Sequence, residues 1–84
     1  MAENTGYHLR EIPKGKLGEF SKIVEEYTEL LDAHEQGSKV LEICELTDLL
    51  GAIKYYASEK FNLSLEDLIQ FSNQTEAAFK IGKR

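Results

Sequence analysis

Two pairs of acidic residues lie symmetrically about Gly37, and this symmetry restricts the fold more than any other feature of the sequence. Glu26 and Asp48 lie eleven residues on either side of Gly37, and Glu29 and Glu45 lie eight residues on either side. If the chain folds back at Gly37 as two antiparallel helices, Glu26 faces Asp48, Glu29 faces Glu45 and four carboxylates converge. Because like charges held this close repel and raise one another's pKa, the pattern favours a divalent cation between the helices.

Apolar residues recur at steps of three and four along most of the chain, which is typical of amphipathic helices. No strand pattern competes with this period. We therefore predict an all-α fold: a three-helix antiparallel bundle that forms a single domain over residues 1–84. Its parts are an irregular N-terminal arm and three helices, over residues 1–15, 16–36, 39–60 and 64–82.

Residues suited to helix ends separate the three predicted helices. Gly37 suits the left-handed position that closes a helix, and Ser38 can cap the helix that follows. Ser64 can cap the third helix, with Asp67 as a shorter substitute for the glutamate of a capping box.

The second predicted helix is apolar on nearly all sides, so we expect it at the centre of the bundle. Glu45 and Asp48 then belong to a face that should be buried, where an isolated ionised carboxylate is costly. Lys39, at the turn, and Lys54, well beyond Asp48, are poorly placed to pair with them. The acids must be protonated, paired or bound to metal, and metal is the simplest answer.

Length and charge limit the class of protein. A chain of 84 residues leaves much apolar surface uncovered, so we expect a homodimer or homotetramer that completes the core. The net charge of −5 argues against binding the backbone of a nucleic acid polymer. With neither a signal sequence nor an apolar run long enough for a membrane span, we expect a cytoplasmic protein whose single cysteine, Cys44, is a buried free thiol.

The residue types in the acidic pairs indicate which metal they would hold. Residues three apart share a helix face, and oxygen-only ligands suit hard cations, Mg²⁺ first and Mn²⁺ as a possible substitute. Zinc or a di-iron centre usually has histidine or cysteine ligands at the same spacing. His8 lies in the arm and His34 beside the turn, so we interpret both as ordinary arm or surface residues.

Three further acids lie close to the four in sequence. Glu25 points about 100° away from Glu26 on a helix, so we expect it in solvent or behind the ligands rather than among them. Asp32 and Glu42 lie five residues on either side of Gly37, and we expect them to form the solvated end of the hairpin. The alternative is an accessory metal site, or a position behind the ligands.

The two acidic segments resemble a family motif. Glu25-Glu26-Tyr27-Thr28-Glu29-Leu30 and Glu45-Leu46-Thr47-Asp48 are similar to the two halves of the ExxE, spacer, ExxD motif of the MazG-like all-α nucleotide pyrophosphohydrolases. That group includes dimeric dUTPase-like and phosphoribosyl-ATP pyrophosphatase-like proteins. The fifteen residues between Glu29 and Glu45 fit the usual spacer of the family, and the resemblance covers roughly residues 14–56.

The resemblance implies a Mg²⁺-dependent enzyme that hydrolyses a nucleoside triphosphate to the monophosphate and pyrophosphate, in control of the nucleotide pool. It implies that Glu26, Glu29, Glu45 and Asp48 are the metal ligands and the catalytic residues, without indicating which of them acts as the base. Two alternatives stay open: a catalytically silent helical interaction module, and a relative that hydrolyses phosphoribosyl-ATP or an alarmone nucleotide.

Other residues are candidates for holding the rest of a nucleotide. Lysines near the acidic pairs or in the arm could bind phosphate, and aromatic, histidine or amide side chains could stack on a base or bind its edge. The phosphate-binding candidates are Lys14, Lys22 and Lys54, and the base-binding candidates are Tyr7, His8, Tyr56 and Asn73.

Overall fold

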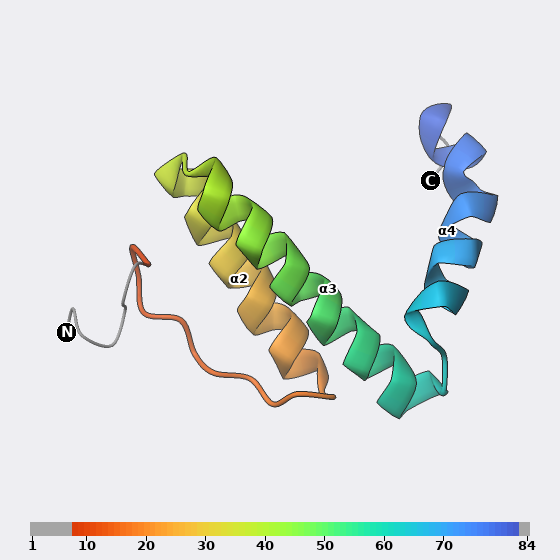
Figure 1. Ribbon diagram of the computed structural model, residues 1–84, viewed down its shortest axis with the longest axis horizontal. Helices are drawn as coiled ribbons and strands as arrows, with labels where there is room; N and C mark the ends of the chain where they lie inside the picture. Colours follow the sequence, from red (N-terminus) through yellow and green to blue (C-terminus); the bar gives the residue numbers. More distant parts are fainter. Residues whose placement is uncertain (1–7, 83–84) are drawn as a thin grey trace.

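The computed structural model describes residues 8–82, which contain three helices and no strand (Figure 1). Helix α2 spans Phe20–Gln36, α3 spans Lys39–Phe61 and α4 spans Leu65–Lys80. The predicted all-α fold is therefore confirmed. Helix α2 begins at Phe20 rather than at residue 16, because a turn precedes it in which the Glu19 N–H donates to the Lys16 carbonyl at 2.9 Å.

Helices α2 and α3 form an antiparallel hairpin that turns at Gly37, as predicted (Figure 1). Gly37 has φ 75°, a left-handed conformation that favours glycine, and its N–H donates to the His34 carbonyl. The Ser38 hydroxyl accepts a hydrogen bond from the Leu41 N–H at 3.3 Å and so caps α3. These contacts fix the register in which the two acidic pairs face each other.

Helix α4 extends away from the hairpin and does not close a bundle (Figure 1). Its N-terminus has the predicted capping box, in which Ser64 and Asp67 exchange two hydrogen bonds. It contacts α3 only slightly and does not contact α2, and none of its residues is buried. The described chain is thus a helical hairpin with a third helix attached, because only α2 packs extensively against α3.

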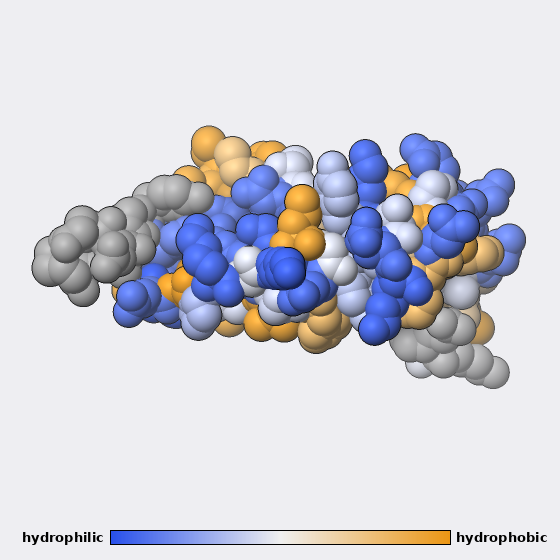
Figure 2. Space-filling model, turned by 90° about the horizontal axis from the view of Figure 1, so that it is seen from below, coloured by the Kyte–Doolittle hydropathy of each residue, from blue (hydrophilic) through white to orange (hydrophobic). Residues whose placement is uncertain are grey.

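The hairpin buries acids more completely than it buries large apolar side chains. Its buried apolar residues are three alanines, Ala33, Ala52 and Ala57, whereas the largest fully buried side chains are those of Glu45 and Asp32. Much of α3 that we expected in a bundle core is exposed, and Figure 2 shows apolar residues on the surface. Cys44 is also exposed, which corrects its expected burial.

The arm over residues 8–19 is attached to α2 through two buried acids. The Leu9 N–H lies within hydrogen-bond distance of both carboxylate oxygens of Asp32, at 3.0 and 2.9 Å. The Gly15 N–H donates to Glu25 Oε1 at 2.8 Å. Gly15 passes so close to α2 that a Cβ there would lie 2.3 Å from the Ser21 carbonyl oxygen, so the contact requires glycine.

These contacts correct the expectation that Asp32 is solvated, because Asp32 is buried. Glu25, which we expected either in solvent or behind the ligands, is buried as well. The backbone of the arm and nearby cations replace the water that both carboxylates would otherwise bind. Burial alone would raise the pKa of Asp32, but the hydrogen bond from Leu9, the amide of Gln36 and the charge of Arg10 outweigh it and hold that pKa below its ordinary value. Asp32 is therefore an ionised group that holds the arm against α2.

No helix in the described part of the chain is both long and apolar enough to cross a membrane.

Candidate metal centre

The hairpin brings together the four acids that the sequence pattern singled out. One carboxylate oxygen from each of Glu26, Glu29, Glu45 and Asp48 lies within 4.8 Å of the other three. Glu26 and Glu45 are buried, Glu29 is half-buried and Asp48 is exposed, so the cluster runs from the helix interface to the surface. Four oxygens from two helices at this separation can surround one hard divalent cation.

The electrostatics of Glu29 show how unfavourable this arrangement is without a cation. Burial, which is the largest cause, and the charges of Glu26 and Glu45 together raise the pKa of Glu29 to about 8. At neutral pH the metal-free cluster therefore holds a proton on Glu29. A metal ion would have to displace that proton, and the positive charge of the ion would take its place.

Lys22 supplies part of the missing positive charge. Its Nζ lies 3.0 Å from Glu26 Oε2 and 3.1 Å from Glu25 Oε1, and its hydrogen bond with Glu26 raises the pKa of the ammonium. Lys39 and Lys54 were predicted to be poorly placed to pair with the acids of α3, and the cation that pairs with the cluster comes instead from the first turn of α2. Glu26 Oε1 is buried and accepts no hydrogen bond. That oxygen is available to a ligand on the side of the cluster.

Glu25 lies beside the cluster, where it pairs with two lysines and also interacts with Glu29. Its carboxylate is 3.7 Å from the Nζ of Lys14 and 3.1 Å from that of Lys22. Burial acts to raise its pKa, but the hydrogen bonds from Gly15 and Lys22 lower that pKa below its usual range. Glu25 therefore positions the arm and the lysines beside the four acids.

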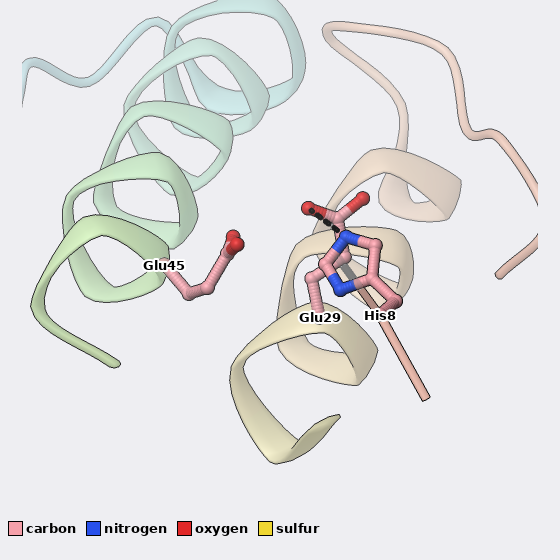
Figure 3. Close-up of side chains that lie close together, drawn as sticks. All are labelled: His8, Glu29 and Glu45. Carbon is pink, nitrogen blue, oxygen red and sulfur yellow. Dashed lines mark ion pairs between the residues drawn. The ribbon is translucent and has the colours of Figure 1, made fainter. Parts of the chain in front are cut away.

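His8 reaches the cluster from the arm, which the sequence analysis did not predict. Its Nε2 lies 3.7 Å from Glu29 Oε1 and its Nδ1 lies 3.6 Å from Asp32 Oδ1. Figure 3 shows the Glu45 carboxylate pointing from α3 toward the paired His8 and Glu29 side chains. His8, Glu29 and Glu45 each place one ligand atom within 4.8 Å of the others.

The other predicted binding residues are spread over the molecule. Lys14 is close to Glu25, and Lys54 is exposed on α3. The ring of Tyr56 packs edge-on against Phe20 and Phe61, with centroid distances of 5.7 and 5.9 Å. Asn73 is exposed on α4, away from α2, and Tyr7 lies outside the described residues. His34 is at the surface as expected, with its ring 3.1 Å from Glu42 Oε2.

A shallow groove of about 230 Å³ lies between the arm and α2. Glu25 and Lys14 line one part of it, so it adjoins the acids through Glu25. The rest is lined by Ile12, Pro13, Ser21, Val24 and Thr28. The described base-binding candidates, His8, Tyr56 and Asn73, do not line this groove. No spacing in the sequence indicated it, because it exists only where the arm crosses the helix.

Comparison with protein-family models, with curated proteins and with solved structures found no match. The assignment of a function therefore depends on the residues and geometry described above.

Proposed function

We propose that this chain is a Mg²⁺-dependent nucleoside triphosphate pyrophosphohydrolase, which converts an NTP or dNTP and water to the monophosphate and pyrophosphate. The main support is the convergence of Glu26, Glu29, Glu45 and Asp48, three of them at least half-buried, at one point between two helices. Asp32 and Glu25 are buried because they attach the arm, whereas these four acids lie against one another where apolar side chains would be more stable. The spacing of the same residues resembles the motif of the MazG-like family.

In this proposal the four carboxylates hold Mg²⁺ and leave part of its coordination shell to water and to phosphate oxygens. A bound Mg²⁺ polarises the phosphate and lowers the pKa of an attacking water. The residues of the chain position the metal ligands. The antiparallel register aligns the acids, and burial of Glu45 keeps its carboxylate in one position.

Lys22 is the best placed of the three candidate lysines to contact a phosphate. Its Nζ is already 3.0 Å from Glu26, at the edge of the cluster, and its side chain is 26% exposed. When a cation neutralises Glu26, the ammonium can turn toward a substrate oxygen. Lys14 lies farther out, at the groove between the arm and α2, where it could meet the outer end of the substrate.

We also propose that two copies of this chain associate through the outer face of α3. Val40, Ile43, Leu46 and Leu50 follow at steps of three and four and are each about half exposed or more. An apolar stripe of this kind on an 84-residue chain is typical of a helix that packs against another helix. Helix α4 has no buried residue in the single chain, and in a dimer it could pack against the partner.

The proposal is tested by release of pyrophosphate from a panel of nucleotides, with and without Mg²⁺, by the wild-type protein and by Glu45→Gln and Asp48→Asn. We expect Mg²⁺-dependent release by the wild type and a loss of at least about a hundredfold in both variants. Glu42→Gln is the matched control, because Glu42 lies one turn before Glu45 on the same helix and outside the cluster. Equal activity in Glu45→Gln and Glu42→Gln would refute the assignment.

A double alanine variant at the same positions separates an enzyme from a silent interaction module. In a silent hairpin, replacing both Glu45 and Asp48 by alanine should raise stability, because it removes repulsion and the cost of a buried charge. In an enzyme it should also abolish the rise in unfolding temperature that Mg²⁺ causes. Phosphoribosyl-ATP and alarmone nucleotides belong in the substrate panel, since the acidic cluster does not select among phosphoanhydrides.

A further inference from the structure

Glu29 and Glu45 belong to two overlapping groups of potential ligands. One group is the set of four carboxylates, and the other adds the imidazole of His8 to Glu29 and Glu45. The second group has a different chemical preference. An imidazole nitrogen is a poor ligand for Mg²⁺ but a common one for zinc, iron, cobalt and nickel, whose affinity for nitrogen exceeds that of the alkaline earths.

We propose that His8, Glu29 and Glu45 form a second metal position at this centre, which binds a divalent transition metal ion and for which His8 is the selective ligand. One nitrogen and two carboxylates supply three protein ligands and leave one position of a tetrahedral shell open. The position is built from three separate parts of the chain, the arm, α2 and α3 (Figure 3). It is distinct from the proposed Mg²⁺ position and would remain if the chain hydrolysed no nucleotide.

The Asp32 carboxylate lies beside the His8 ring, as carboxylates lie beside many metal-binding histidines, although the distance is longer than that of a hydrogen bond. Histidine ligands usually direct their second ring nitrogen at a carboxylate, which fixes the tautomer and makes the ligating nitrogen more basic. Here the fully buried Asp32 lies 3.6 Å from Nδ1, while Nε2 faces Glu29 at 3.7 Å. An ionised carboxylate beside Nδ1 favours the proton on that nitrogen and leaves the Nε2 lone pair for a metal ion.

The backbone holds His8 in this place independently of any metal. The Leu9 N–H donates to the Asp32 carboxylate, and Arg10 also lies 3.7 Å from it, so the residues after His8 are attached to α2. The side chain of His8 is 13% exposed, whereas that of His34, the other histidine of the chain, is 70% exposed. Beside the position, the buried Glu26 Oε1 accepts no hydrogen bond from the described residues, although Lys22 pairs with the other oxygen of that carboxylate.

Titration of untagged protein with Zn²⁺ in a calorimeter tests the proposal. All variants should carry Cys44→Ser, because Cys44 is an exposed thiol that could bind zinc by itself. We expect His8→Gln to weaken Zn²⁺ binding by at least about tenfold while leaving the Mg²⁺-induced rise in unfolding temperature unchanged. His34→Gln is the matched control and should bind Zn²⁺ like the parent. Equal affinity in the His8→Gln and His34→Gln proteins would overturn the proposal.

A second measurement needs no substitution at His8. The chain has two histidines, so their imidazole signals can be assigned in a nuclear magnetic resonance spectrum of the Cys44→Ser protein. Stoichiometric Zn²⁺, which is diamagnetic, should shift the ring signals of His8 and leave those of His34 in place. A shift of neither set of signals, or an equal shift of both, would reject His8 as the selective ligand. Neither test measures hydrolysis. Failure of the proposed transition-metal position would therefore not refute the proposed enzyme, and failure of the proposed enzyme would not refute the transition-metal position.

Discussion

Replacement of Glu29 by glutamine gives the most direct test of the reasoning about the acidic cluster. A glutamine has the shape of a protonated glutamate and carries no charge at any pH. In the metal-free protein it therefore mimics the state that burial and the charges of Glu26 and Glu45 already impose on Glu29 near neutral pH. The variant should fold at least as well as the wild type without metal, and it should respond less to Mg²⁺.

The size and sign of the effect follow from the pKa of Glu29. Its value of about 8 in the folded chain lies above the ordinary 4.5, so the folded state holds a proton that the unfolded state has lost. The favourable contribution of the protonated form is complete below about pH 4.5 and is lost as the pH rises through 8. The shift corresponds to at most about 5 kcal/mol, and because solvent screens part of the side chain we expect about 2 kcal/mol.

Urea denaturation at pH 5, 7 and 9 in the presence of a chelator measures this loss. The free energy of unfolding of the wild type should fall across the series by about 2 kcal/mol more than that of Glu29→Gln. Glu76→Gln is the matched control, because Glu76 is an exposed acid on α4 whose carboxylate pairs with Lys80. Saturating Mg²⁺ at pH 9 should restore about 2–3 kcal/mol to the wild type and less to the variant. Parallel curves for the wild type and Glu29→Gln would refute the picture of a strained cluster.

Four further changes test separate parts of the structure. Lys22→Met should destabilise the metal-free protein by about 1–2 kcal/mol in urea denaturation, because it leaves Glu26 unpaired, and saturating Mg²⁺ should reduce that loss. Asp32→Asn should free the arm and expose it to limited proteolysis while α2 and α3 keep their helical circular dichroism. Gly37→Ala should cost about 1 kcal/mol, since the left-handed backbone and not a steric clash opposes the new Cβ. Leu46→Glu should shift the protein to monomers in analytical ultracentrifugation, and an unchanged mass would contradict association through the outer face of α3.

Local signals predicted the hairpin and the cluster well. The left-handed Gly37, the cap at Ser38 and the capping box at Ser64 each depend on residues a few positions apart, so the sequence determines them directly. Once both helices and the turn are known, the antiparallel register follows. That register brings the ligand atoms of Glu29 and Glu45 within 4.8 Å, as the symmetry about Gly37 required.

Contacts between distant segments were not predictable in the same way. The apolar period of α4 indicates a helix but does not indicate which element packs against it. In the described chain α4 has few contacts with the other helices. The positions of His8, Glu25 and Asp32 depend on how an irregular arm crosses α2, and no periodic pattern describes such a path. A weak signal existed at Gly15, because a glycine just before a helix can allow the close approach that places the arm.

The interface of α2 and α3 contains acidic side chains where most helical hairpins have apolar ones, and this links the stability of the chain to metal binding. The buried apolar residues of the interface are three alanines. Leucines in place of Glu26, Glu29 and Glu45 would therefore make the metal-free hairpin more stable. The cost of the acids falls when a cation binds, so metal binding and folding become parts of one equilibrium. The arm belongs to the same equilibrium, since Asp32 and Glu25 attach it on the flank of the cluster. Metal affinity and arm attachment should therefore change together in any variant that disturbs one of them.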